Sequence, residues 1–263
     1  MQLERWQKLT TPYNCWKGKV ADFYAFAIPP SKDNMKKHLE PSTLAFIKEL
    51  RQNNQRDWFE KNRDRYEAAR KDFILFLETL VEGASAFEPA LAGQKPKDLM
   101  FRIYRDVRFS NDKRPYKEHI CAYMAEGGRK TINPGFYLHI SPDNQSFLAG
   151  GVWMPPAPEL KAIRQEIDYN LEELQGLLNN AEFKRYFDGL GGEKLKTTPK
   201  GYDADNPAIE FLRHKSWNAS CMFSDELVTS DRFYDEVLAA MQAVKPINDF
   251  FMRPMQDLKA EEV

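Results

Sequence analysis

The segment "GFYLHISPDNQSFLAGGVW", residues 135–153, decides the fold of this chain. It contains two runs rich in aromatic and branched residues, which favour β-strands. The intervening "SPDNQS", residues 141–146, consists of residues that form tight turns. Because parallel strands need a long crossover, a turn this short predicts an antiparallel pair rather than a βαβ unit.

Other segments with an alternating pattern extend this sheet. After Pro96 the sequence predicts strands in "LMFRIYR" (99–105), "HICAYMAE" (119–126) and "KSWNASCMFS" (215–224). In the last of these, alternate residues fall on one face of the strand, namely Trp217, Ala219, Cys221 and Phe223. The glycine pair at 127–128 predicts a turn, so adjacent strands should pair antiparallel.

Helical patterns flank the strands on both sides. "PSTLAFIKELRQNN" (41–54) predicts a helix with Ser42 or Thr43 as N-cap, and the 58–83 segment predicts a second helix that ends at Gly83. Later helices are predicted over 155–190, from Asn206 as N-cap, and from Ser230 onward. The sequence therefore predicts an α+β fold, with a mainly antiparallel β-sheet packed with N-terminal and C-terminal helices.

Composition and periodicity also predict the domain organisation. The 263 residues are 42% hydrophobic and 29% charged, as is typical of globular proteins. Residues 1–34 lack clear periodicity and end near Pro29-Pro30, so we expect an extension that is dispensable for folding. Residues 35–263 are predicted to form a single α+β domain, whose oligomeric state stays open.

Charge, cysteines and motifs exclude several classes of protein. The net charge of −1 argues against a broad nucleic-acid-binding face. The three cysteines are far apart, which argues against a disulfide framework or a zinc site and fits a cytoplasmic protein. No stretch of consecutive apolar residues approaches the length of about 20 that spans a bilayer, so no membrane association is expected. Nucleotide-binding and hydrolase motifs are missing, so no cofactor is predicted.

Several longer motifs resemble a bacterial and fungal family described as a domain of unknown function. They are "NNQRDWFEKNRDRY", "FRIYRDVRFSNDKRPYKEH", "GFYLHISPDNQSFLAGGVW", "PKGYDADNPAIEFLRHKSW" and a closing amphipathic helix, and the resemblance runs from about Thr43 to about Phe250. The resemblance implies an α+β fold and supplies no activity or catalytic residue. Members commonly have a histidine where this chain has Asn206, which argues against acid–base or metal chemistry at that position.

The candidate site is "RIYRDVRFSNDKRPYKEH", residues 102–119, where cations gather among aromatic residues. Guanidinium groups match the oxygens of carboxylates and phosphates, so closely spaced arginines fit an anion better than they fit each other. The predicted ligand-binding residues are Arg102, Tyr104, Arg105, Arg108, Lys113, Tyr116 and Lys117. The alternative is that Arg105 and Arg108 are structural and paired to Asp106, Asp112 or carboxylates of the preceding helix.

Three functions are open at this stage. The first is a cytoplasmic binder of a small anionic ligand, or an enzyme that acts on one. The second is a non-enzymatic interaction module that uses the basic loop to bind an acidic protein surface. The third is single-stranded nucleic-acid binding, with Tyr104, Phe109 and Tyr116 stacking on bases. A pocket lined by Arg102, Tyr104 and Lys117 would favour a small ligand, and an exposed surface would favour a partner.

The histidines offer an alternative chemistry. His119 and His139 could transfer protons or bind metal. A divalent metal held by Asp106, Asp112 and His119 is the alternative, but no ligand spacing supports a metal site, and none is predicted. Cys121 shares a strand face with His119, as a thiol–imidazole pair requires, although a buried, inert cysteine is the favoured interpretation. His38 and His214 are expected on the surface.

Overall fold

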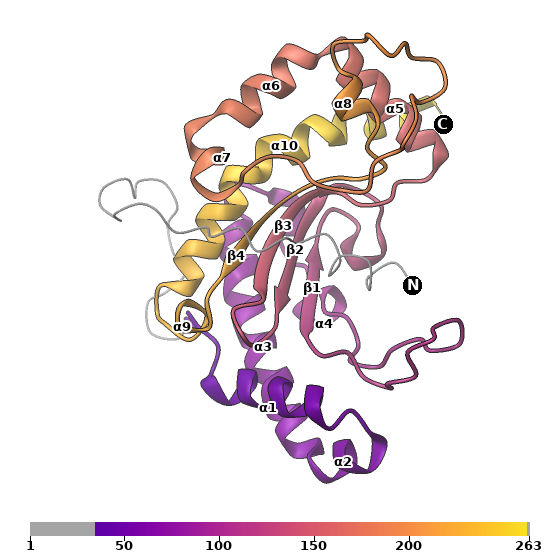
Figure 1. Cartoon of the computed structure of the whole chain (residues 1–263). Helices are drawn as coiled ribbons and strands as arrows, with labels where there is room; N and C mark the ends of the chain where they lie inside the picture. Colours follow the sequence, from indigo (N-terminus) through magenta and orange to yellow (C-terminus); the bar gives the residue numbers. More distant parts are fainter. Residues whose placement is uncertain (1–34, 262–263) are drawn as a thin grey trace.

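The computed structural model describes residues 35–261, and the predicted extension 1–34 lies outside them. Strands β1 (Ile120–Met124), β2 (Gly135–Ile140), β3 (Ser146–Val152) and β4 (Trp217–Phe223) form one antiparallel sheet in chain order (Figure 1). The predicted hairpin is confirmed, since β2 pairs with β3 across a turn in which Asp143 and Asn144 have φ of 65° and 58°. Aspartate and asparagine tolerate this left-handed conformation better than most residues.

Helices from before, within and after the strands pack around the sheet, with α3 and α10 against one side of it (Figure 1). Before the sheet lie α1 (Pro41–Gln52), α2 (Arg56–Lys61), α3 (Arg63–Ala84) and α4 (Pro96–Leu99). Between β3 and β4 lie α5 (Ala157–Tyr169), α6 (Leu171–Asn179), α7 (Ala181–Tyr186) and α8 (Ile209–Leu212), and α9 (Asp225–Val228) and α10 (Phe233–Glu261) follow β4. Two 3₁₀ turns span Pro89–Leu91 and Gly128–Lys130. The predicted α+β class is confirmed.

One face of the sheet holds the main core. Helix α10 runs along β3 and also contacts β2, and α3 contacts β1. The four residues predicted to share one face of β4, Trp217, Ala219, Cys221 and Phe223, are all buried. Burial of this apolar surface is the main favourable contribution to folding. No helix of residues 35–261 is both long and apolar enough to cross a membrane.

Gly150 lets α10 approach the sheet closely. A Cβ atom at this position would lie 2.6 Å from a methyl carbon of Val244 in α10. We therefore expect Gly150→Ala to lower the free energy of unfolding by about 2 kcal/mol through overpacking. Denaturant unfolding should show partial rescue when Gly150→Ala is combined with Val244→Ala. Simple addition of the two losses would contradict this account of the contact.

The N-terminal helices differ from the sequence prediction at their boundaries. Helix α1 begins at Pro41 with Glu40 as N-cap, so the prediction of Ser42 or Thr43 as N-cap was wrong. The Thr43 hydroxyl instead donates to Asp72 of α3 over 2.7 Å, and Asp72 also accepts from the Glu40 N–H at 2.9 Å. The second predicted helix is divided into α2 and α3 at Asn62.

Two predictions near β4 are also corrected. Helix α8 begins at Ile209 rather than next to Asn206, because the Asn206 side chain accepts from the Ala208 N–H in a turn that precedes the helix. His214 is buried rather than on the surface, and its ring lies 6.4 Å from that of Trp217. Burial lowers the pKa of His214 to about 4.

Candidate functional site: a basic arm

The predicted site residues lie on a projecting loop, residues 102–118, which we call the basic arm (Figure 1). The prediction that "LMFRIYR" forms a strand was wrong, because this segment makes only the single bridges Met100↔Ala122 and Tyr104↔Tyr116. Pro115 lacks an N–H group and serves only as an acceptor, taking a 2.9 Å hydrogen bond from the Arg105 N–H. The arm therefore consists of two loosely paired limbs, residues 102–105 and 115–118, which are joined by residues 106–114.

The base of the arm is built into the core through Tyr116. Its ring is buried and stacks on Phe59 of α2 at a centroid distance of 4.0 Å. The Asn54 side chain accepts from the Tyr116 N–H at 3.1 Å and donates to the Tyr116 carbonyl at 3.0 Å. Tyr104 lies beside this pair and is 45% exposed. The two predicted tyrosines therefore have different surroundings, one in the core and one on the surface.

Asn54 should therefore be required to hold the arm in place. Asn54→Ala leaves the buried N–H and carbonyl of Tyr116 without their side-chain partner, which should reduce the free energy of unfolding by about 2 kcal/mol. Denaturant unfolding measures this loss. Asn53→Ala is the matched control, because the Asn53 side chain donates only to the Glu49 carbonyl at an exposed position. Equal losses in the two variants would contradict this role for Asn54.

A chain of ion pairs fixes the middle of the arm. Asp112 lies 2.8 Å from the Arg105 guanidinium and 2.6 Å from that of Arg114, and Arg114 also pairs with Glu118. Hydrogen bonds from Arg114 and then Arg105 hold the pKa of Asp112 well below its usual range. The Arg105 side chain is only 10% exposed. The geometry thus supports the structural alternative for Arg105, and Glu118 is a carboxylate partner that the local sequence pattern did not indicate.

The remaining predicted residues lie on the surface of the arm. Arg108 pairs with Asp106 at 2.6 Å and its side chain is 76% exposed, while Lys113 donates to the Val107 carbonyl at 3.0 Å. Arg102 is exposed, and the Lys117 ammonium lies 5.3 Å from the centre of the Phe101 ring. The arm thus presents cations toward solvent.

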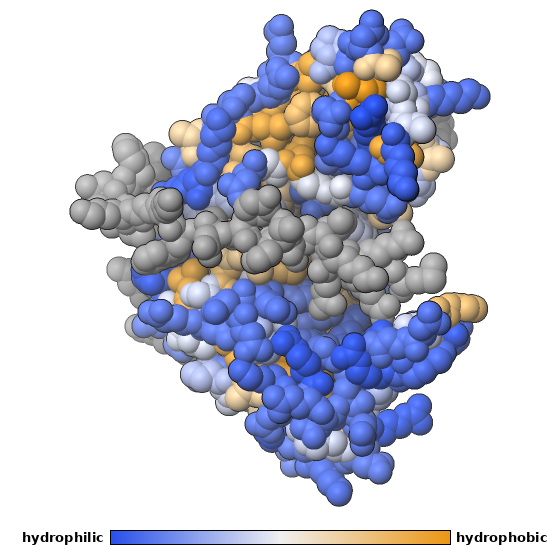
Figure 2. Space-filling view, viewed as in Figure 1, coloured by the Kyte–Doolittle hydropathy of each residue, from blue (hydrophilic) through white to orange (hydrophobic). Residues whose placement is uncertain are grey.

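Phe109 marks the tip of the arm. It is 84% exposed, the highest value among the large hydrophobic residues of the described chain, and the Arg108 guanidinium lies 5.8 Å from its ring centre. Figure 2 shows a small apolar end on an otherwise hydrophilic arm. The sequence pattern indicated Phe109 only as a residue that could stack on bases. The signal that could have singled it out is one aromatic residue within a run of turn-forming and charged residues.

The histidines form a separate, buried group on the other face of the sheet. The rings of His119 and His139 lie 4.2 Å apart, and the Tyr137 hydroxyl lies 3.2 Å from His139 Nδ1. Burial lowers the pKa of His139 to about 3 and that of His119 well below its usual value. Cys121 is buried, as predicted, and burial raises the pKa of its thiol. Within residues 35–261, no three His, Cys, Asp or Glu side chains form a potential metal-binding group.

The fold and the arm together define an α+β protein in which a four-stranded antiparallel meander lies against helices from both ends of the described chain. A family model described as conserved hypothetical protein (DUF2461) matches residues 42–250, and the chain belongs to this family. The family resemblance seen over about residues 43–250 is thereby confirmed. No curated protein and no solved structure matched the chain.

Proposed function

We propose that this protein is a non-enzymatic interaction module whose basic arm binds an acidic protein surface. The proposal rests on Phe109, whose side chain is 84% exposed at the tip of an arm that bears exposed cations. An exposed aromatic side chain flanked by arginine is the composition found at the energetic centres of protein interfaces. An acidic partner with an apolar recess would match both features.

The ion pairs within the arm support this function. Asp112 pairs with Arg105 of the first limb, and Arg114 pairs with Glu118 of the second, so the arm is ordered before a partner arrives and loses less conformational entropy on binding. Arg102 and Lys113 remain exposed at its surface, and Lys113 contacts a neutral carbonyl rather than a carboxylate. Their charges are available to steer an acidic partner toward the arm.

Small-anion binding is the second candidate. It is favoured by Tyr104, which is half exposed next to the base of the arm and interacts with the Arg63 guanidinium of α3. An anion at this position would meet cations from α3 and from the arm. Nucleic-acid binding is the third, and it predicts affinity that falls steeply with salt.

Two further expectations belong to this proposal. The buried thiols of Cys121 and Cys221 fit a reducing compartment, which supports a cytoplasmic location. The core runs from Leu39 to Met255 as one cluster, which supports a single domain over residues 35–263.

The test is the binding of a fluorescent peptide of alternating glutamate and leucine, measured by anisotropy. Phe109→Ala and Lys113→Ala should each weaken binding about tenfold, the loss typical of a removed hot-spot contact. The matched controls are Tyr169→Ala and Lys161→Ala on α5, because Tyr169 is 73% exposed and Lys161 is exposed. Both controls should bind the peptide as the parent does.

The other two functions predict that different ligands bind the protein. Binding of phosphate, ATP or citrate without binding of the peptide would replace the proposal with the small-anion function. Binding of oligothymidylate with a steep salt dependence would replace it with nucleic-acid binding. Equal losses in the arm variants and in the α5 controls would contradict any specific role of the arm.

A further inference from the structure

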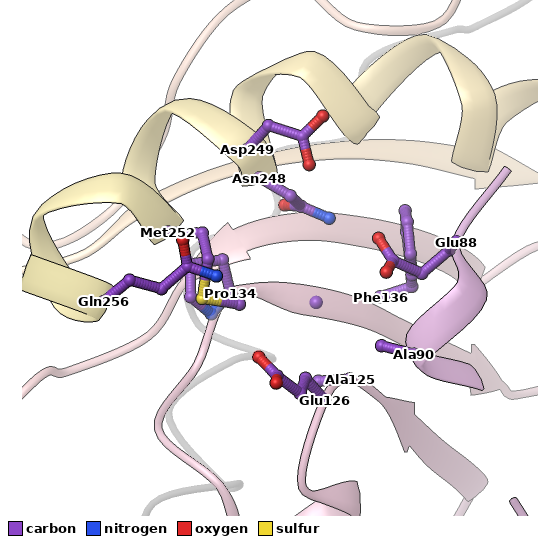
Figure 3. A pocket seen from close by; sticks show the side chains of 11 residues that line it. Glu88, Ala90, Ala125, Glu126, Pro134, Phe136, Asn248, Asp249, Met252 and Gln256 are labelled. Atoms are coloured by element: carbon purple, nitrogen blue, oxygen red, sulfur yellow. The ribbon is translucent and has the colours of Figure 1, made fainter. Parts of the chain in front are cut away.

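A second candidate site lies at the opposite end of β1 from the basic arm, between the sheet and α10. It is a pocket of about 210 Å³, several times the roughly 30 Å³ that one water molecule occupies in the liquid. Its walls come from the 3₁₀ turn at Pro89–Leu91, the segment after β1, the start of β2 and one face of α10 (Figure 3). None of the predicted site residues lines it.

Acidic side chains dominate the charge of this pocket. Glu88, Glu126 and Asp249 line it. The Lys245 ammonium lies 2.6 Å from Asp249 and 3.6 Å from Glu88. Among residues 35–261, the Glu126 carboxylate meets only the neutral side-chain amide of Asn133, at 3.5 Å. The oxygen of that amide accepts from the Lys259 ammonium at 3.0 Å. The carboxylates that line the pocket therefore outnumber the ammonium groups that pair with them.

Asn248 adds a buried hydrogen-bond donor that points into the pocket. Its side-chain oxygen accepts from the Gly151 N–H at 2.6 Å, which fixes the orientation of the amide. The residue is 4% exposed, and its Nδ2 has no hydrogen-bond acceptor among the described residues. In Figure 3 this nitrogen lies on the side of Glu88 and Phe136. A buried donor without an acceptor is costly, so this position favours an oxygen atom from a ligand.

We propose that this pocket binds a small organic cation, with a primary ammonium group between Glu88 and Glu126 and a neutral oxygen that accepts from Asn248. The carboxylates satisfy an ammonium group through charge-assisted hydrogen bonds. Phe136 and Met252 supply an apolar wall for the carbon atoms of the ligand. A hydroxyl or carbonyl oxygen suits Asn248 better than a carboxylate, which the acidic lining would repel.

The same chemistry can come from two sources, a free amine or the lysine side chain of another protein. The full chain is titrated with ethanolamine, ethylamine and ethylene glycol, and with Nα-acetyl-lysinamide as the lysine source, and binding is followed by calorimetry. Ethanolamine should bind about tenfold more tightly than ethylamine, which lacks the oxygen, and ethylene glycol should not bind. Tight binding of acetyl-lysinamide alone would support the same site and assign it to a partner's lysine.

Variants separate the charge from the hydrogen bond. Glu126→Gln and Glu88→Gln should each weaken ethanolamine binding at least tenfold, while Glu78→Gln on the exposed surface of α3 should not. Asn248→Asp keeps an acceptor for the Gly151 N–H but loses the donor, so it should remove the preference for 2-methoxyethylamine, whose ether oxygen can only accept, over ethylamine. Melting temperatures confirm that each variant is folded.

Two results would overturn the proposal. One is that no amine binds at millimolar concentration. The other is that amines bind but Glu126→Gln and Glu88→Gln bind them as the parent does. Neither result bears on the basic arm, which the peptide assay tests separately.

Discussion

Lowering the pH from 7 to 5 should reduce the free energy of unfolding by about 2 kcal/mol for each of three buried imidazoles, and so by about 6 kcal/mol in total. His119, His139 and His214 are all buried, and burial lowers the pKa of each in the folded protein. The unfolded chain binds protons at an ordinary histidine pKa of about 6.5. The folded state is therefore at a disadvantage once the unfolded histidines become charged.

The direction of this effect follows from the lowered pKa values. Above about pH 7 the histidines are neutral in both states, so the free energy of unfolding does not depend on them. It falls as the pH drops through the unfolded pKa of about 6.5 toward the folded values, which are about 3 for His139 and about 4 for His214. Urea unfolding at a series of pH values measures it. His139→Gln should reduce the slope between pH 6.5 and pH 5 by roughly a third, since one of three titrating groups is gone. Gln165→Ala, at an exposed position of α5, removes no titrating group and should leave the slope unchanged, and an equal slope in all variants would contradict the account.

Asp72→Ala should lower the free energy of unfolding by about 3 kcal/mol, because it removes the cap of α1 together with a partly buried ion pair. Asp72 is 8% exposed and lies 2.9 Å from the Lys36 ammonium. It also accepts from the Glu40 N–H and the Thr43 hydroxyl at the start of α1. The substitution leaves all three donors without this acceptor.

Asp72→Asn is the informative companion variant. Its amide oxygen can still accept from the Thr43 hydroxyl or the Glu40 N–H, but the charge that attracts Lys36 is lost. We expect a loss smaller than that of Asp72→Ala, measured by denaturant unfolding at neutral pH. If Asp72→Ala unfolds at the same denaturant concentration as the parent, Asp72 does not cap α1.

Local patterns predicted the four strands of the sheet. The alternation in 215–224 and the turn residues around Asp143-Asn144 depend on neighbours in the sequence, and both are confirmed. The closing amphipathic helix is confirmed as well, since Phe233, Val237 and Met241 of α10 are all buried. Such periodic signals report which side of an element faces the core.

Contacts between distant segments were not predictable in this way. The acceptor at the start of α1 is Asp72 of α3, which lies 32 positions after Glu40. The local sequence offers only Ser42 and Thr43 as N-cap candidates, so this contact could not be predicted from it. The burial of His214 depends on packing near Trp217 rather than on its own neighbours in the sequence. The pocket next to α10 combines Glu88 and Asn248, 160 positions apart, and no short motif marks it.

The candidate site was predicted in composition but not in geometry. The concentration of cations in 102–119 located the arm, yet sequence alone could not separate Arg105, paired to Asp112, from the exposed Arg102. "LMFRIYR" has the alternation of a strand, but its partner segment contains Pro115, which cannot donate to a ladder. The result is a projecting arm instead of a fifth strand.

We expect Arg105 to stabilise the arm and Arg102 to contact a partner protein. The most direct measurement compares Arg105→Ala with Arg102→Ala, recording both the free energy of unfolding and the affinity for the glutamate–leucine peptide. Arg105→Ala should cost about 1–2 kcal/mol of stability, since Asp112 keeps Arg114 as a partner. Arg102→Ala should leave stability unchanged and weaken peptide binding about tenfold. The reverse pattern, with Arg102→Ala destabilised and peptide binding intact, would contradict the claim.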